Sequence, residues 1–164
     1  MDEVEIVNYD PRWPVLFDEE AKRLRAVLDP SLILRLEHFG STAVPNLSAK
    51  PIIDILIAVR SLTDAQATFV EALRNLDYVY WADNPKKDRM FFVKGMPPFG
   101  SRRSHHVHVT EPHGEMCSGW RSGTICALIQ RKPGRTSGSK DDLPPNIRRI
   151  VRLMPTLNLP TSKA

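Results

Sequence analysis

The sequence predicts an α/β (α+β) fold in which a mixed sheet is flanked by helices, and three observations support this class. The chain has 164 residues, which suits one domain, since domains most often contain about 100–150 residues. Hydrophobic residues make up 41% and charged residues 26% of the chain, as in globular proteins and unlike collagen, coiled coils or disordered chains. Short apolar runs typical of strands alternate with segments of helical spacing.

Two helices are predicted from apolar residues that recur every three or four positions. The first is expected at residues 12–28, with Trp13 and Phe17 packed in the core. The second is expected at residues 63–76, with Thr63 as its N-cap. Its apolar side would contain Ala67, Val70, Leu73 and Leu76.

The remaining apolar runs predict strands at Val4–Ile6, 32–39, 51–59, 90–93 and 106–109. The run at 51–59 is apolar almost throughout, which is typical of a central strand that is buried on both faces. The elements therefore follow one another as strand, helix, strand, strand, helix, strand, strand. This order is typical of a sheet protein of the predicted class.

Charge is distributed unevenly along the chain. The net charge is +4, but residues 117–164 contain nine Lys/Arg and two Asp/Glu, so residues 1–116 are mildly acidic. We therefore expect no nucleic-acid partner for the body of the protein. The chain has no apolar run of membrane-spanning length, and its start lacks the pattern of a signal peptide, so we expect a cytoplasmic protein with no membrane partner.

Asp54 is the most informative residue, because it lies within the most hydrophobic run of the chain. A buried carboxylate is costly unless it is paired or bound to a cation. Gly40 and Ser41 form a turn at the end of the preceding predicted strand. A Gly-Ser turn opposite a carboxylate suits a nucleoside triphosphate, since the turn binds phosphate oxygens and the carboxylate binds Mg²⁺.

Several polar residues near this turn have two interpretations each. Glu37 and His38 flank the turn, and each is either a second polar ligand or part of a solvated strand end. Lys50 either contacts a phosphate or covers the rim of the sheet. Arg102 and Arg103 lie beside a loop rich in Gly and Pro, where they either attract an anion or are ordinary loop residues.

His106 and His108 alternate along one predicted strand, so their side chains share a face of the sheet. Two such imidazoles would bind a metal or stabilise a leaving phosphate, or they would simply be packed in the sheet. No third ligand at a characteristic spacing along the chain indicates zinc. Cys117 and Cys126 also lack the spacing of a zinc site.

Three segments resemble the GrpB family, also called UPF0157: YDPRWPVLFDEEAKRL, EHFGSTAVPNLSAKPIIDILIAV and HHVHV. The resemblance covers residues 3 to about 115 and implies the nucleotidyltransferase fold of polymerase-β-like enzymes. It implies transfer of a nucleotidyl group from a nucleoside triphosphate to an unknown small acceptor, with Mg²⁺ as cofactor. By this resemblance Gly40 and Ser41 would hold the triphosphate and Asp54 would be the metal ligand. With the candidates from the residues themselves, we expect the catalytic residues Asp54, Glu37 and His108 and the phosphate-binding residues Gly40, Ser41, Thr42, Lys50 and His106.

Two positions depart from the family pattern. The wider superfamily has a second carboxylate two residues after the first, where this chain has Leu56. This departure leaves open an impaired enzyme or a non-catalytic nucleotide- or anion-binding module of the same fold. Asn46 stands where the family usually has Gly, and because Asn tolerates left-handed backbone, we expect the turn to persist.

The segment from Cys117 onward does not resemble the family. It is basic and rich in Pro, Gly and Ser, so we expect a poorly ordered tail at residues 117–164 after a C-terminally incomplete domain at residues 1–116. Back-translation from the last base of the Met116 codon can spell, in an alternative frame, the FRDYLR-containing sequence that the family has at this place. We interpret the tail as the product of a frameshift near this codon.

Overall fold

The computed structural model describes residues 5–112. The predicted tail and its interpretation as a frameshift product fall on residues 117–164, outside the described residues, and the domain boundary at residue 116 stays a prediction. The described elements are α1 (Trp13–Val27), β1 (Ile33–Phe39), the 3-10 helix η1 (Ser41–Ala43), β2 (Ile53–Val59), α2 (Leu62–Arg74), β3 (Tyr78–Tyr80), β4 (Arg89–Lys94) and β5 (His105–Thr110).

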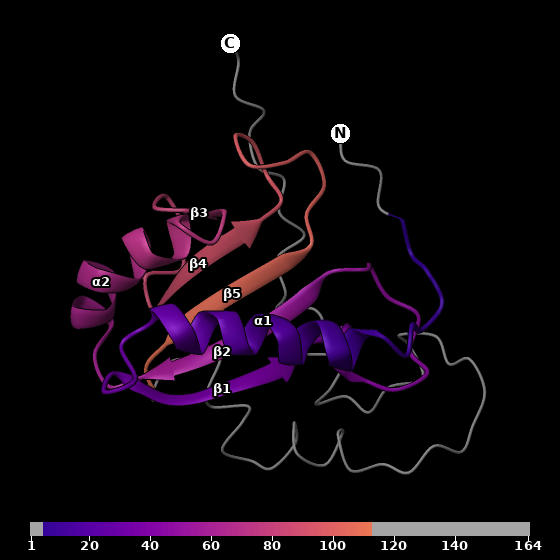
Figure 1. Cartoon of the computed structure of the whole chain (residues 1–164), viewed down its shortest axis with the longest axis horizontal. Coiled ribbons are helices and arrows are strands. Elements are labelled where there is room, and N and C mark those ends of the chain that lie inside the picture. Colours follow the sequence, from indigo (N-terminus) through magenta and orange to yellow (C-terminus); the bar gives the residue numbers. More distant parts are fainter. Residues whose placement is uncertain (1–4, 113–164) are drawn as a thin grey trace.

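The five strands form one mixed sheet in the order β1-β2-β5-β4-β3. Strands β2 and β5 are parallel, and the other neighbouring strands are antiparallel. Figure 1 shows α1 lying across β1 and β2, with α2 beside the β3 and β4 side of the sheet. The predicted class, a mixed sheet with helices packed on it, is confirmed.

The main core lies between the helices and one face of the sheet. Ile53, Ile55 and Ile57 alternate along β2 and are buried together with Leu24 of α1 and Phe69 of α2. The intervening residues of β2 point to the opposite face, because side chains alternate along a strand. The predicted central strand is thus confirmed, although it begins at Ile53 rather than Pro51.

A buried ion pair joins α1 to strand β4, and a hydrogen bond joins it to strand β3. Glu20 of α1 has 2% of its surface exposed, and its Oε1 accepts hydrogen bonds from Lys94 Nζ at 2.7 Å and from the Tyr78 hydroxyl at 3.0 Å. Because Lys94 and Tyr78 lie on β4 and β3, this cluster ties α1 to the two strands at one end of the sheet order.

The predicted first strand is wrong in extent. Val4 lies outside the described residues, and Ile6 is half exposed and lies in no strand. Instead, an isolated bridge pairs Val7 with Ala49. Strand β3 was not predicted, because its three residues are too few to show a period.

The second helix differs in detail from its prediction. Ser61 rather than Thr63 is the N-cap, and its hydroxyl accepts a hydrogen bond from the Asp64 N–H at 3.2 Å. The buried side of α2 contains Ala65, Phe69 and Leu73, whereas Ala67 is exposed. In the first helix, Trp13 is buried as predicted and Phe17 is partly buried against the core. Neither helix among residues 5–112 combines the length and the hydrophobicity needed to cross a bilayer.

Candidate functional site

Asp54 and the two strand histidines meet on the sheet face opposite the helices. His106 is the register partner of Asp54 across the parallel pair β2 and β5. Its Nδ1 lies 3.1 Å from Asp54 Oδ1, and His108 Nε2 lies 4.0 Å from the same oxygen. One potential ligand atom from each residue lies within 4.8 Å of the others. The fold therefore places a third potential ligand beside the two histidines, which their spacing along the chain could not reveal.

The alternation of both strands produces this cluster. Asp54 and Leu56 on β2 lie opposite His106 and His108 on β5, and all four side chains share one face. The Phe91 ring lies against both imidazoles, with ring centroids 5.2 Å from His106 and 4.6 Å from His108. These contacts fix the planes of the two imidazoles beside the carboxylate.

Burial keeps His108 uncharged. Only 3% of its surface is exposed, and this burial lowers the pKa of His108 to about 3, although the charge of Asp54 favours the protonated form. Among the described residues, three buried imidazole nitrogens have no hydrogen-bond partner: His106 Nε2 and His108 Nδ1 in this cluster, and His105 Nε2 on the other face of the sheet. In His106 and His108 these are the nitrogens that do not face Asp54 Oδ1.

The Gly-Ser turn lies next to the carboxylate, as the sequence predicted. Phe39, the last residue of β1, is the register partner of Asp54, and Gly40 follows directly. Gly40 has φ 82° and ψ −168°, a conformation that only glycine adopts readily. Ser41 then begins the 3-10 helix. The turn and the carboxylate are thus neighbours on adjacent strands.

Thr42 anchors this turn from inside the fold. It is 1% exposed, its Oγ1 donates to the Ile52 carbonyl at 3.1 Å, and the same oxygen lies 3.1 Å from His38 Nε2. His38 lies on the helix side of the sheet, where its ring stacks on Phe17 at a centroid distance of 4.9 Å. The fold therefore uses the Thr42 hydroxyl, and the predicted contact with a phosphate stays a prediction.

Glu37 lies on the same face of the sheet as Asp54, but it does not belong to the cluster of Asp54, His106 and His108. It lies opposite Leu56 on β1, and its Oε1 is 3.2 Å from Arg35 Nε. Leu56 is buried with 4% exposure, two residues after Asp54 on the same strand face. The described cluster therefore has one carboxylate and two imidazoles, and the catalytic part predicted for Glu37 stays a prediction.

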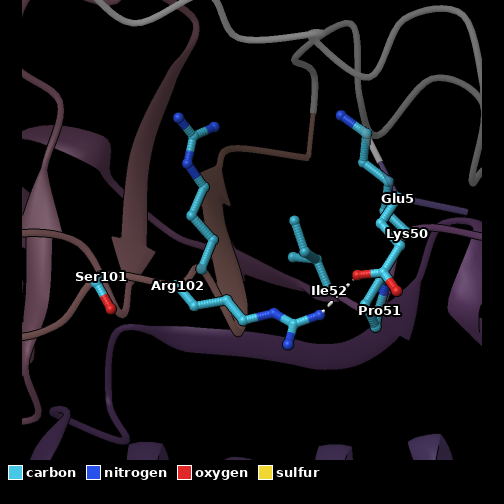
Figure 2. Close-up of a pocket in the computed structure, with 7 residues that line it drawn as sticks. Glu5, Lys50, Pro51, Ile52, Ser101 and Arg102 are labelled. Carbon is cyan, nitrogen blue, oxygen red and sulfur yellow. Dashed lines mark hydrogen bonds and ion pairs between the residues drawn. The ribbon is translucent and has the colours of Figure 1, made fainter. Parts of the chain in front are cut away.

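Lys50 lines a separate pocket of about 210 Å³ with Glu5, Pro51, Ile52, Ser101, Arg102 and Arg103. Figure 2 shows Lys50 near Glu5, with Arg102 reaching across the pocket to the Glu5 carboxylate. This ion pair is 2.9 Å long and largely exposed. The pocket lies where the chain enters β2 and β5, because the Ile53 N–H donates to the Ser104 carbonyl. Positive charge is therefore gathered at the strand ends that carry Asp54 and His106.

The fold and the site define a small mixed α/β protein with a polar cluster at the start of two parallel strands. The sequence model described as "GrpB protein" matches residues 3–122. The chain belongs to the GrpB family, which confirms the predicted resemblance.

Individual relatives support this membership. A UPF0157 protein of Pseudomonas aeruginosa is 52% identical over 109 residues, which are 66% of this chain and 44% of that protein. A protein named dephospho-CoA kinase, from Mycolicibacterium paratuberculosis, is 40% identical over 112 residues, which are 66% of this chain and 26% of that protein. The chain thus spans less than half the length of either relative.

A solved structure agrees with the fold. The crystal structure of conserved protein GrpB from Enterococcus faecalis matches with a TM-score of 0.59 and 36% sequence identity. The match covers 65% of this chain and 61% of that chain.

Proposed function

We propose that this chain binds a nucleoside triphosphate at the Gly40 turn and the Asp54 cluster and transfers its nucleotidyl group to a small acceptor. The observation that carries the proposal is the register of Phe39 with Asp54, which puts a glycine turn beside a carboxylate. Phosphate oxygens at the turn would then lie next to a cation at Asp54, and a cation there would neutralise charge on the transferred phosphate.

The basic pocket supports the phosphate part of the proposal. Lys50, Arg102 and Arg103 line it, and Ile52 in its wall lies two residues from Asp54, about 7 Å along an extended chain. Lysine and arginine side chains make charge-assisted hydrogen bonds to phosphate. A triphosphate held at the turn would extend toward this pocket.

The expected cofactor, Mg²⁺, does not suit the donor atoms of the cluster. Mg²⁺ takes oxygen ligands in octahedral geometry, usually from carboxylates, phosphates and water. Here Asp54 is joined by two imidazoles instead of a second carboxylate. We therefore assign no step of the reaction to Mg²⁺ and limit the proposal to nucleotide binding and transfer at these residues.

A second candidate is a non-catalytic module that binds a nucleotide or a smaller anion. The specific observation in its favour is Leu56, which is buried where nucleotidyltransferases have their second carboxylate.

Isothermal titration of the full chain with ATP, CTP, GTP and UTP tests the proposal, with Mg²⁺ or Zn²⁺ present. We expect one nucleotide per chain and an affinity at least tenfold lower in Asp54→Asn. The matched control is Asp77→Asn, because Asp77 is an exposed aspartate with φ 66°, which asparagine tolerates. If no nucleotide binds to the folded wild-type chain, the proposal is wrong. Binding without pyrophosphate release across a panel of acceptors would instead support the module.

A further inference from the structure

We infer that Asp54, His106 and His108 bind a divalent transition-metal ion, such as Zn²⁺, in preference to Mg²⁺. This inference deepens the proposed function, on which it rests for the part that a cation plays in phosphate binding. Its geometric basis is that one potential ligand atom from each residue lies within 4.8 Å of the others. Metal–ligand bonds of about 2.0–2.2 Å in a tetrahedron separate ligand atoms by about 3.4 Å, so small side-chain rotations complete the site.

The donor atoms select the kind of ion. Imidazole nitrogens suit Zn²⁺, Co²⁺, Ni²⁺ and Fe²⁺, whereas Mg²⁺ prefers oxygen. Three protein ligands with an open fourth position are typical of catalytic rather than structural zinc. The open position would accept a water molecule or a phosphate oxygen.

The ring nitrogens that face Asp54 favour a cation beside this carboxylate. His108 Nε2 lies 4.0 Å from Asp54 Oδ1, which is beyond hydrogen-bonding distance. His106 Nδ1 lies 3.1 Å from the same oxygen. A cation among these three atoms would accept the lone pairs of both nitrogens and would balance the charge of the carboxylate.

The surroundings hold the ligands in place. All three lie on the hydrogen-bonded pair β2 and β5 rather than on loops. The Phe39 ring contacts the His108 ring edge-on at 5.2 Å, and Phe91 lies against both histidines. Ligands that are fixed by packing lose little entropy when a metal binds.

Charge balance links the ion to the phosphate ligand. One carboxylate and two neutral imidazoles leave a divalent ion with a net charge of about +1. Such a centre attracts an anion to its open position. The metal would therefore strengthen binding of a phosphate oxygen beside the Gly40 turn.

Direct metal binding tests this inference without any assay of activity. The full chain, stripped with a chelator, is titrated with Zn²⁺, Co²⁺ and Mg²⁺ by calorimetry, and the visible bands of Co²⁺ report its ligand geometry. We expect one Zn²⁺ per chain at this site, displacement of Co²⁺ by Zn²⁺, and no displacement by Mg²⁺ in hundredfold excess. His106→Gln and His108→Gln should each lower Zn²⁺ affinity at least tenfold.

Two controls keep the result specific. His105→Gln changes the neighbouring histidine of β5, which points to the helix side, and should leave Zn²⁺ binding unchanged. The same titrations in a Cys117→Ser, Cys126→Ser background exclude binding by these two thiols. Zn²⁺ binding that survives both His106→Gln and His108→Gln, or Mg²⁺ binding that equals Zn²⁺ binding, would overturn the inference.

The two proposals fail in distinguishable ways. Zn²⁺ binding at these three residues without nucleotide binding would leave the metal site standing and remove the proposed function. Nucleotide binding with Mg²⁺ in a chain that takes up no Zn²⁺ would remove the metal site and retain the proposed function. If the chain shows neither Zn²⁺ uptake nor Co²⁺ bands, Asp54 and His106 form only a hydrogen-bonded pair, and the inferred metal site is wrong.

Discussion

His106 Nδ1 lies 3.1 Å from Asp54 Oδ1, and this contact joins residues that are 52 positions apart in the sequence. It follows directly from the parallel register of β2 and β5, which pairs the two residues. The contact also explains how a carboxylate is tolerated in the most apolar run of the chain. Asp54 points away from the main core, and its side chain has a polar partner there.

Replacement of Gly40 by alanine should destabilise the turn that we assign to phosphate binding. A Cβ at φ 82° and ψ −168° costs about 1–3 kcal/mol, and the strain should also shift the turn. Urea denaturation of Gly40→Ala measures the cost, and calorimetry measures the loss of nucleotide affinity. Asn46→Gly is the matched control, because Asn46 has φ 65° and glycine accepts that conformation within about 0.5 kcal/mol. Equal stability of Gly40→Ala and wild type would contradict the account of the turn.

The left-handed geometry at Asn46 also confirms the expectation that asparagine can replace the family's usual glycine there.

Lys94→Met should be among the most destabilising single changes in the fold. It leaves the buried Glu20 carboxylate with the Tyr78 hydroxyl and with Arg23, a largely exposed cation whose Nη1 lies 3.3 Å from Glu20 Oε2. Because Arg23 compensates part of the charge, the loss should lie at the lower end of the range, about 3–5 kcal/mol, that breaking a buried ion pair costs. The double variant Glu20→Gln, Lys94→Met removes both charges and should recover most of that loss. Denaturation curves of the wild type, the single variant and the double variant measure both effects. A double variant no more stable than Lys94→Met would refute the ion-pair explanation.

The free energy of unfolding should fall as the pH drops from about 6.5 to 4, and His38 should account for part of this fall, beside His105 and His108, whose pKa values are also lowered by burial. Burial lowers the pKa of His38 to about 4, and this outweighs the charges of Asp54 and Asp18, which favour protonation. Because the unfolded chain keeps a histidine pKa near 6.5, it binds more protons than the folded chain in this window. Each such group costs up to about 1.4 kcal/mol per pH unit.

Urea midpoints at pH 7.5, 6 and 5, with chelator present, measure this dependence. His38→Gln should flatten it by up to the stated slope while keeping a polar group near Thr42. The explanation fails if the wild type and His38→Gln lose stability in parallel.

The basic pocket should contribute affinity for the phosphates of a nucleotide. Lys50→Met should weaken tripolyphosphate binding about tenfold, which corresponds to about 1.4 kcal/mol, a typical value for one charge-assisted hydrogen bond. The control is Arg74→Gln, which removes a positive charge from the exposed end of α2. Calorimetry at two salt concentrations separates a local contact from general charge attraction. Identical losses in the two variants would argue against the pocket.

Local patterns in the sequence were enough to predict the two helices, the central strand and the proximity of the Gly40 turn to Asp54. The spacing of hydrophobic residues over a few positions determines the helices and the central strand. The short connection between β1 and β2 makes them sheet neighbours, which brings the Gly40 turn beside Asp54. The partner of Asp54 was not predictable in this way, because strand pairing across 52 residues depends on the whole sheet. The opposite orientations of His38 and His106 likewise follow from register rather than from spacing. Two signals in the sequence pointed to this cluster: the carboxylate of Asp54 within an apolar run, and the alternation of His106 and His108.

The most direct test of the central claim is ¹⁵N NMR of the histidine side chains in the full chain, before and after addition of one equivalent of Zn²⁺. Each imidazole nitrogen has its own signal, so the spectrum identifies the atoms that bind. We predict that His106 Nδ1 and His108 Nε2, the nitrogens that face Asp54 Oδ1, shift on Zn²⁺ addition, while the signals of His38 and His105 stay in place. Unchanged signals for His106 and His108 in the presence of Zn²⁺ would contradict the assignment of this cluster as the functional site.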